Sequence, residues 1–396
     1  GGYDVDYISD SFIKSTSCQD GMLKTRGGAC YKALIVPAVK LIPVSTLKKL
    51  VALARQGATV VFVEHYPEDV PGYASLKQNR EQLFALLEQL PGEKSFRGTQ
   101  AFNFGKGRII VGSDYHETLE RTGVPAEELK TRWGVQFIRR THTEGHHYFI
   151  SDLQANDVEG WVTLNVPEKH IMCFDPMTGK RGIAKTREVE GKTQVYMQLK
   201  SGESIILQTF TRSLQGEPEW KYRKEMDYSL SLDHGWKLKF VESYPAIEGE
   251  FEIDTPSSWT EVAHPAAKIN RGTALYSLEL DLPELSADDW ILDLGDVRES
   301  ARVRINGQEA GVAWSAPFRL SIGQLLKPGK NLIEVEVTNL PANSIAEMDR
   351  QGKQWRIFED INMAKLNYEK GTYGHWETLP SGLNGIVRLI PVKYLF

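Results

Sequence analysis

The chain has 396 residues, of which 41% are hydrophobic and 25% are charged, and its formal net charge is −5 at pH 7. This composition is typical of a globular protein, and the length favours two or three domains over one core. The negative charge disfavours nucleic acid or an anionic membrane as a partner. No segment approaches the ~20 apolar residues of a membrane-spanning helix.

Residues 1–133 are predicted to form an α/β domain. The segments 33–36 (ALIV) and 59–63 (TVVFV) are continuous apolar runs, as in strands that are buried on both faces, and a third strand is expected at 108–111. Apolar residues repeat at helical spacing between these strands. Strands that alternate with helices imply a parallel sheet, so the region is interpreted as a flavodoxin-like domain.

The first helix of this domain is expected to be capped by Ser45 and to end at Gly57. The fold resembles that of class I glutamine amidotransferases, whose chemistry needs a nucleophilic cysteine on a sharp turn after a strand. Here Glu64 and His65 follow the strand 59–63, and no cysteine does. The domain is therefore predicted to share the amidotransferase fold without its chemistry. Glu64 and His65 are explained more simply as polar residues of a surface loop.

Three cysteines leave one question open. Cys18 and Cys30 flank a polar, glycine-containing loop and could face each other in a hairpin, forming a disulfide in an oxidising compartment, or remain free thiols. Cys173 lies in an apolar run and is expected to be a small buried residue.

Residues 134–226 are predicted to form a small antiparallel β-sandwich, since apolar strands such as GWVTLNV and SIILQTF are separated by turns. His142, His146 and His147 suggest a metal site, with Asp152 nearby. However, His146 and His147 are neighbours, so on a strand they point to opposite faces. A solvated strand edge is the favoured interpretation, and no metal or other cofactor is expected.

Residues 227–396 are predicted to form a jelly roll. Hydrophobic and polar residues alternate over 301–305 and 333–338, as in half-buried strands. Asn306-Gly307 is the dipeptide that a type I′ hairpin favours. The run LDLGDVRESARVRINGQEAGVAW and the closing SGLNGIVRL resemble the sugar-binding domain of glycoside hydrolase family 2, which implies a galactose-binding-like sandwich. Adjacent acids such as Asp288-Asp289 are expected to be surface charges.

A long insert from Asp349 to Gly385 interrupts the last strands of this jelly roll. Aromatic rings beside planar hydrogen-bonding side chains suit a carbohydrate surface. The alternative is that the aromatics pack the insert onto the sandwich or onto a neighbouring domain, and this alternative is favoured because a long loop needs a core of its own. The candidate carbohydrate-binding residues are Trp355, Arg356, Tyr373, His375 and Trp376, and further aromatics of the insert are Phe358 and Tyr368.

The order of these segments resembles the part that follows the catalytic barrel in glycoside hydrolase family 106, whose members are α-L-rhamnosidase-like. The segments are YDVDYISDSFI, DVPGY, GWVTLNV, FDPMTGK and LPSGLNGIVRL. The resemblance implies a catalytic barrel on the N-terminal side of this chain, which would carry both catalytic carboxylates and the metal. No residue here matches those carboxylates, so no catalytic residue is assigned.

The sequence therefore predicts the ancillary C-terminal region of a rhamnosidase-like glycoside hydrolase, which supports the barrel, contacts carbohydrate and is inactive alone. A bacterial-type periplasmic or extracellular location is expected from the resemblance. One alternative is a stand-alone carbohydrate-binding protein that uses the jelly roll. The other is an amidotransferase-like hydrolase. This alternative is disfavoured because no nucleophilic cysteine follows the strand 59–63.

Overall fold

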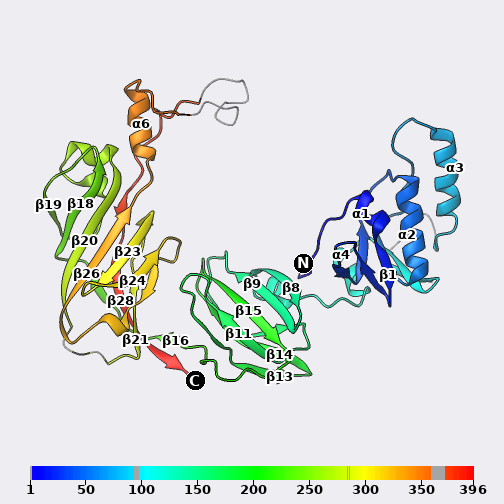
Figure 1. Cartoon of the computed structure of the whole chain (residues 1–396), viewed down its shortest axis with the longest axis horizontal. Coiled ribbons are helices and arrows are strands. Elements are labelled where there is room, and N and C mark those ends of the chain that lie inside the picture. Colours follow the sequence, from blue (N-terminus) through cyan, green and yellow to red (C-terminus); the bar gives the residue numbers. More distant parts are fainter. Residues whose placement is uncertain (1, 93–97, 283, 285, 358–370) are drawn as a thin grey trace. The chain divides into compact units, whose positions relative to one another are not determined.

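A computed structural model describes residues 2–92, 98–282, 284, 286–357 and 371–396. The chain divides into two compact units. Unit 1 comprises Gly1–Trp133 with Thr163–Val166, and unit 2 comprises Gly134–Val162 with Pro167–Phe396. Figure 1 labels the elements of both units. The finer division into three domains stays a prediction.

Unit 1 is built on a four-stranded sheet in the order β4-β5-β7-β6. The first three strands are parallel and β6 is an antiparallel edge strand. All five residues of β5 are buried, as predicted for a strand that is covered on both faces. The expected alternation of strands and helices is confirmed, while the flavodoxin-like assignment is finer than this sheet shows. The bounds are β4 (Ala33–Val36), α2 (Val44–Gln56), β5 (Thr59–Val63), α3 (Leu76–Leu87), β6 (Gln100–Phe104), β7 (Gly107–Gly112), α4 (Tyr115–Glu120) and α5 (Glu128–Thr131).

Helix α2 ends where the sequence predicts and begins before the predicted cap. Gly57 stands at its C-terminus with φ 131°, a conformation that glycine adopts without steric cost. Ser45 lies inside the helix, and the capping position is taken by Pro43, so the predicted cap is wrong. The ring of Pro43 holds φ at −62°, which places the chain for entry into the helix without a side-chain cap.

A separate three-stranded sheet answers the disulfide question. Its order is β1-β2-β3, with bounds β1 (Ser17–Gln19), β2 (Met22–Lys24) and β3 (Cys30–Tyr31). Cys18 pairs with Leu23, and Cys30 pairs with Lys24, so β2 lies between the two cysteines. Two strand spacings separate them by roughly 10 Å, which is beyond the reach of a disulfide. Both thiols are free.

The strands of residues 136–210 form a small sandwich, here called the middle sandwich. A five-stranded antiparallel sheet in the order β12-β11-β15-β9-β8 accompanies a three-stranded sheet in the order β10-β14-β13. Cys173 is 1% exposed within this core, and burial raises the pKa of its thiol, as a small buried residue should show. The bounds are β8 (Gln136–His142), β9 (Gly145–Ser151), β10 (Val158–Leu164), β11 (His170–Phe174), β12 (Arg181–Ile183), β13 (Thr186–Val189), β14 (Lys192–Leu199) and β15 (Ser204–Phe210).

The strands from Tyr222 to Leu395 form a larger sandwich, here called the C-terminal sandwich. One sheet has the order β19-β18-β20-β26-β23-β24, and the other has the order β16-β28-β21-β25 with β17 paired to β28 (Figure 1). The bounds are β16 (Tyr222–Glu225), β17 (Leu230–Leu232), β18 (Trp236–Tyr244), β19 (Glu250–Ile253), β20 (Arg271–Leu282), β21 (Asp289–Asp293), β22 (Val297–Arg298), β23 (Ser300–Ile305), β24 (Gln308–Ala313), β25 (Arg319–Ser321), β26 (Gly329–Thr338), α6 (Ala342–Arg350), β27 (Gly382–Leu383) and β28 (Val387–Leu395).

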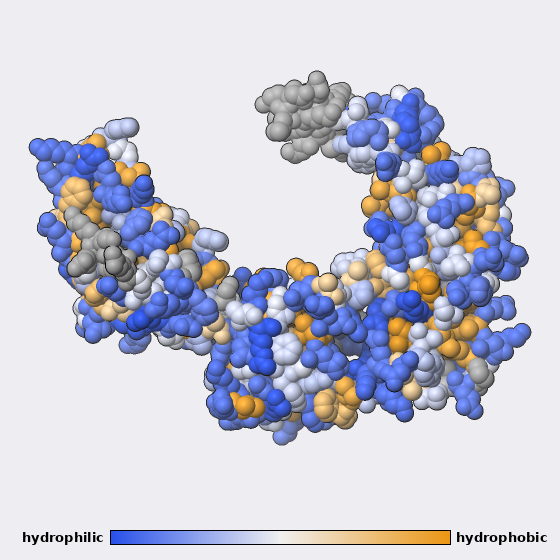
Figure 2. Space-filling view, turned by 180° about the vertical axis from the view of Figure 1, so that it is seen from behind, coloured by the Kyte–Doolittle hydropathy of each residue, from blue (hydrophilic) through white to orange (hydrophobic). Residues whose placement is uncertain are grey.

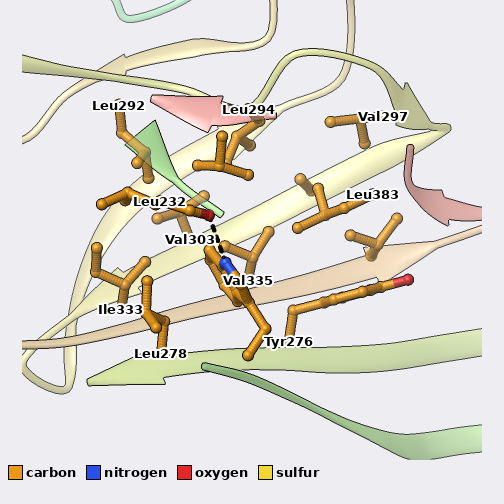
Figure 3. Close-up of a cluster of buried hydrophobic side chains, with 14 of the residues drawn as sticks. Leu232, Tyr276, Leu278, Leu292, Leu294, Val297, Val303, Ile333, Val335 and Leu383 are labelled. Carbon is orange, nitrogen blue, oxygen red and sulfur yellow. Dashed lines mark hydrogen bonds between the residues drawn. The ribbon is translucent and has the colours of Figure 1, made fainter. Parts of the chain in front are cut away.

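The core of the C-terminal sandwich confirms the predicted alternation. The inward residues of 301–305 and 333–337 are completely buried, while Arg302 and Arg304 point outward. Asn306 and Gly307 both have positive φ, as the predicted hairpin requires. Figure 3 shows this core, in which Leu232 accepts a hydrogen bond from the indole of Trp236 at 2.7 Å. Burying such side chains contributes about 1.5–3 kcal/mol each, which makes this core the main stabilising element of the sandwich.

A network of charges links the middle and C-terminal sandwiches within unit 2. Arg319 lies 2.9 Å from Glu225 and 3.3 Å from Asp293, while Lys200 lies 3.0 Å from Glu225 and 2.8 Å from Asp157. Burial alone would raise the pKa of the Glu225 carboxyl, but Arg319 and Lys200 together lower it. The network therefore holds Glu225 ionised at neutral pH.

Asp289 corrects one expectation from the sequence. It was expected at the surface, but it is 5% exposed. Its Oδ1 accepts hydrogen bonds from the backbone N–H groups of Trp290 and Gly323 at 2.8 and 3.0 Å, and its Oδ2 accepts one from Ser321 at 2.5 Å. A buried carboxylate is stable only with such partners, which the sequence of one strand does not show.

Hydrophilic residues cover most of the face that Figure 2 shows, and hydrophobic ones appear in small separate groups. No helix among the described residues is long and apolar enough to cross a membrane.

Candidate functional site

The insert of the C-terminal sandwich leaves after α6 and returns before β27, and Asp349 joins its two ends. The Nε1–H of Trp355 donates a hydrogen bond to Asp349 Oδ1 at 2.7 Å, and the backbone N–H of Tyr373 donates one to Oδ2 at 2.5 Å. The bonds from Tyr373 and then Trp355 lower the pKa of the Asp349 carboxyl, so it stays ionised. One carboxylate at the end of α6 thus fixes both arms of the insert.

Four of the five predicted binding residues lie together in an aromatic cluster, defined here as Trp355, Arg356, Tyr373 and Trp376. The ring centroids of Tyr373 lie 5.8 Å from Trp355 and 4.5 Å from Trp376. The guanidinium of Arg356 lies 4.9 Å from the centroid of Trp355 and 5.3 Å from that of Tyr373, within cation–π range. Arg356 also donates a hydrogen bond to the backbone oxygen of Gly371.

The exposure of these side chains divides the cluster into a packed part and an open part. Trp355, Arg356 and Tyr373 are half-buried, and they pack against one another. Trp376 is 39% exposed, and the neighbouring His375 is exposed. The cluster therefore supplies the insert with a small core of its own and leaves one indole and one imidazole at the surface. Phe358 and Tyr368, the other aromatics that the sequence suggested, lie outside the described residues.

A hollow of about 840 Å³ on the C-terminal sandwich is the feature that sequence reasoning missed. It is lined by residues 256–258, 260 and 261, by Lys268 in the short 3₁₀ helix Pro265–Ile269, by Asp296, and by Thr378, Pro380 and Asn384. These segments are far apart in sequence, and the runs LDLGDVRES and SGLNGIVRL, which contain Asp296 and Asn384, indicate strands and turns but no hollow. Only the return of the insert to the sandwich brings residues 378–384 beside the loop 256–261.

The histidines of the middle sandwich are separated as the sequence predicts. His146 Nδ1 lies 3.2 Å from Glu168 Oε2, whereas the ring of His147 lies 4.5 Å from that of His142 on the other face of β9. Burial lowers the pKa of His147, and the neighbouring His142 lowers it further. Across residues 2–92, 98–282, 284, 286–357 and 371–396, no three His, Cys, Asp or Glu side chains are grouped to hold a metal ion.

The carboxyl end of β5 carries the two polar residues that the sequence singled out. Glu64 is exposed and has φ 66°, and the Nδ1 atom of His65 lies 2.9 Å from the backbone oxygen of Tyr66. Both cysteines of unit 1 lie on the separate sheet of β1, β2 and β3. The arrangement at this edge does not bring together the thiol and imidazole of an amidotransferase.

Comparison with known proteins gives the family relationship. The model of glycoside hydrolase family 106, described as alpha-L-rhamnosidase, matches residues 1–186. The solved structure of a rhamnosidase from Novosphingobium sp. PP1Y superposes with a TM-score of 0.73 and 24% identity, covering 97% of this chain and 36% of that one. The fold described above is therefore shared with that protein over nearly all of this chain.

A curated relative is also named as a glycoside hydrolase. A Formosa agariphila protein, whose name marks it provisionally as a beta-glucuronidase, is 29% identical over 197 residues, which is 45% of this chain and 17% of that protein. The chain thus spans about a third or less of the length of these two proteins. The resemblance to glycoside hydrolase family 106 that the sequence predicts is confirmed, and the chain is related to the glycoside hydrolases.

Proposed function

We propose that this chain is the ancillary region of a rhamnosidase-like glycoside hydrolase, which supports a catalytic barrel on its N-terminal side and contacts carbohydrate. The coverage supports the proposal, since the chain aligns along 97% of its own length with a rhamnosidase but spans 36% of that protein. A (β/α)₈ barrel of about 250 residues would fit within the remainder. The two carboxylates that cleave a glycosidic bond would belong to that barrel.

The two units have different roles in this proposal. Unit 1, interpreted as flavodoxin-like, has no assigned chemistry and would brace the barrel. The C-terminal sandwich, interpreted as a jelly roll, would present the insert to the substrate. A periplasmic or extracellular site of action fits an enzyme that degrades polymeric carbohydrate.

The aromatic cluster with His375 carries the proposed contact with carbohydrate. Trp376 offers an indole that is 39% exposed, and its ring centroid lies 4.5 Å from that of the half-buried Tyr373. A fixed ring loses little conformational entropy when a sugar packs its C–H groups against it. His375 and Arg356 are the adjacent hydrogen-bond donors.

The test is calorimetry of the whole chain with rhamnose-containing oligosaccharides. We expect Trp376→Ala to abolish binding. The matched control is Trp314→Ala, because Trp314 is 61% exposed on the same sandwich and lies outside the cluster. Wild-type chain that binds no oligosaccharide, or equal losses in the two variants, would refute the contact.

Catalysis is tested separately. The purified chain should release no rhamnose from an aryl rhamnoside, and release of sugar by pure protein would overturn the ancillary role. In a longer enzyme that contains this region, replacing Trp355 and Trp376 together should raise KM for polymeric substrate and leave kcat unchanged. A stand-alone binding protein would show the same calorimetry without any such enzyme.

A further inference from the structure

The N-terminal arm, defined here as residues 2–15, is fixed to the body of unit 1 by its acidic side chains. The carboxylate of Asp6 accepts a hydrogen bond from the hydroxyl of Tyr31 on β3 at 2.5 Å. The carboxylate of Asp10 accepts one from the hydroxyl of Thr46 in the first turn of α2 at 2.7 Å. The arm therefore belongs to the folded unit, and its position is set before any partner arrives.

The apolar side chains of the same arm face away from unit 1. In helix α1 (Asp10–Ser15), Ile13 is the buried residue, and it packs against the core of unit 1. Four large apolar side chains within eight residues remain exposed: Val5 at 59%, Tyr7 at 102%, Ile8 at 37% and Phe12 at 62%. Single exposed apolar residues are common on protein surfaces, whereas a group of them marks a contact surface.

The arm also carries negative charge that its own contacts leave in place. Residues 2–12 contain Asp4, Asp6 and Asp10 and no lysine or arginine. The donors to Asp6 and Asp10 are hydroxyl groups, which are neutral. A complementary partner would therefore surround an apolar centre with lysine or arginine side chains.

The catalytic barrel of the proposed function matches this surface, and the inference rests on that function. The chain aligns over 97% of its own length with a rhamnosidase but spans 36% of that protein, so most of such an enzyme lies outside this chain. A barrel joined on the N-terminal side would stay at high effective concentration beside the arm. The outer ring of a (β/α)₈ barrel consists of helices, and the groove between two helices accepts a row of apolar side chains.

We propose that the N-terminal arm is the surface on which the catalytic barrel docks. The side chains of Tyr7 and Phe12 lie between two outer helices of the barrel, and basic side chains at the edge of the contact pair with Asp6 and Asp10. Because the arm is already fixed to unit 1, docking costs little conformational entropy. The bracing role proposed for unit 1 is thereby assigned to particular residues.

Hydroxyl-radical footprinting with mass spectrometry tests this contact. Tyr7 and Phe12 should be oxidised readily in the 396-residue chain, where both are exposed. In a longer enzyme that contains the barrel and this region, they should be oxidised roughly tenfold more slowly, because the centre of an interface excludes water. Phe84 is the internal control and should react equally in both proteins. It is 48% exposed on α3, which Figure 1 shows on the opposite side of α2 from α1.

Phe12→Lys and Phe84→Lys provide a matched pair of variants. Both side chains are exposed, so neither change should alter the Tm of the 396-residue chain. In the longer enzyme, Phe12→Lys should lower Tm by about 4–8 °C, as expected when a central interface residue is lost, and Phe84→Lys should not. Footprinting needs no substitution, so it gives an answer even if a variant fails to fold.

Three results would overturn the inference. Equal oxidation of Tyr7 and Phe12 in the two proteins would exclude the arm as the contact, while an active longer enzyme would leave the proposed function standing. Protection that rises with the concentration of the 396-residue chain, together with a dimer mass in light scattering, would assign the arm to a second copy. A native gene that encodes no barrel beside this region would refute the proposed function and the docking surface together.

Discussion

Replacing Trp236 by Phe should destabilise the C-terminal sandwich by about 3 kcal/mol. Trp236 is 1% exposed, and its Nε1–H donates a 2.7 Å hydrogen bond to the carbonyl of Leu232 (Figure 3). Without the indole nitrogen, a buried carbonyl loses its partner, which costs about 1–3 kcal/mol. The smaller ring also leaves a cavity in a packed core, which adds about 1 kcal/mol.

Differential scanning calorimetry of the whole chain measures this change. For a sandwich of this size, each kcal/mol lowers Tm by about 2–4 °C, so the transition of the C-terminal sandwich should fall by about 6–12 °C. The control is Trp314→Phe, which alters a side chain that is 61% exposed and should stay within about 0.5 kcal/mol of the wild type. Equal Tm values for the two variants would show that the buried hydrogen bond does not stabilise the fold.

Three further predictions concern charges and thiols. Arg80, and after it the backbone N–H of Val70, lower the pKa of Asp69 to about 2, so the stabilisation from the Arg80 pair should be present above pH ~4 and lost as the pH falls toward 2. NMR titration of Arg80→Met should find a raised pKa that stays below that of an ordinary carboxyl, and an unchanged pKa would contradict the pairing. Oxidation of the native chain should leave Cys18 and Cys30 without an intramolecular disulfide, and a mass loss that maps to this pair would refute the strand order. Arg319→Gln should lower Tm by several degrees because two carboxylates lose their shared partner, and an unaltered Tm would show that the network contributes nothing.

The parts of the fold that could be predicted are those that local patterns determine. The apolar run 59–63 indicates a strand covered on both faces, and the period-two alternation at 301–305 indicates a half-buried one; the structure confirms both. Gly57 and Asn306-Gly307 were predicted because their backbone conformations require particular residues. In each case the information lies within a few neighbouring residues.

The parts that could not be predicted depend on neighbours that are distant in sequence. Cys18 and Cys30 were candidates for a disulfide because the loop between them could form a hairpin in which they face each other, and the strand β2 that separates them is part of that same loop. Asp289 is a residue type that is usually exposed, and it was therefore expected at the surface. It can be buried because Ser321 on β25 and the backbone of Gly323 donate hydrogen bonds to its carboxylate. No local pattern contains such information.

The aromatic insert shows why composition alone does not determine the role of a segment. Its aromatics suggested either a sugar platform or a local core, and the half-buried Trp355 and Tyr373 form such a core around Arg356 while Trp376 remains open. The core fixes the return segment, and that segment continues into Thr378 and Asn384, which line the hollow. Losing Asp349, which holds both arms, should therefore weaken the proposed sugar binding at Trp376 although Asp349 itself lies outside the aromatic cluster. A chain in which Asp349→Asn left that binding intact would show that the insert is held by other contacts.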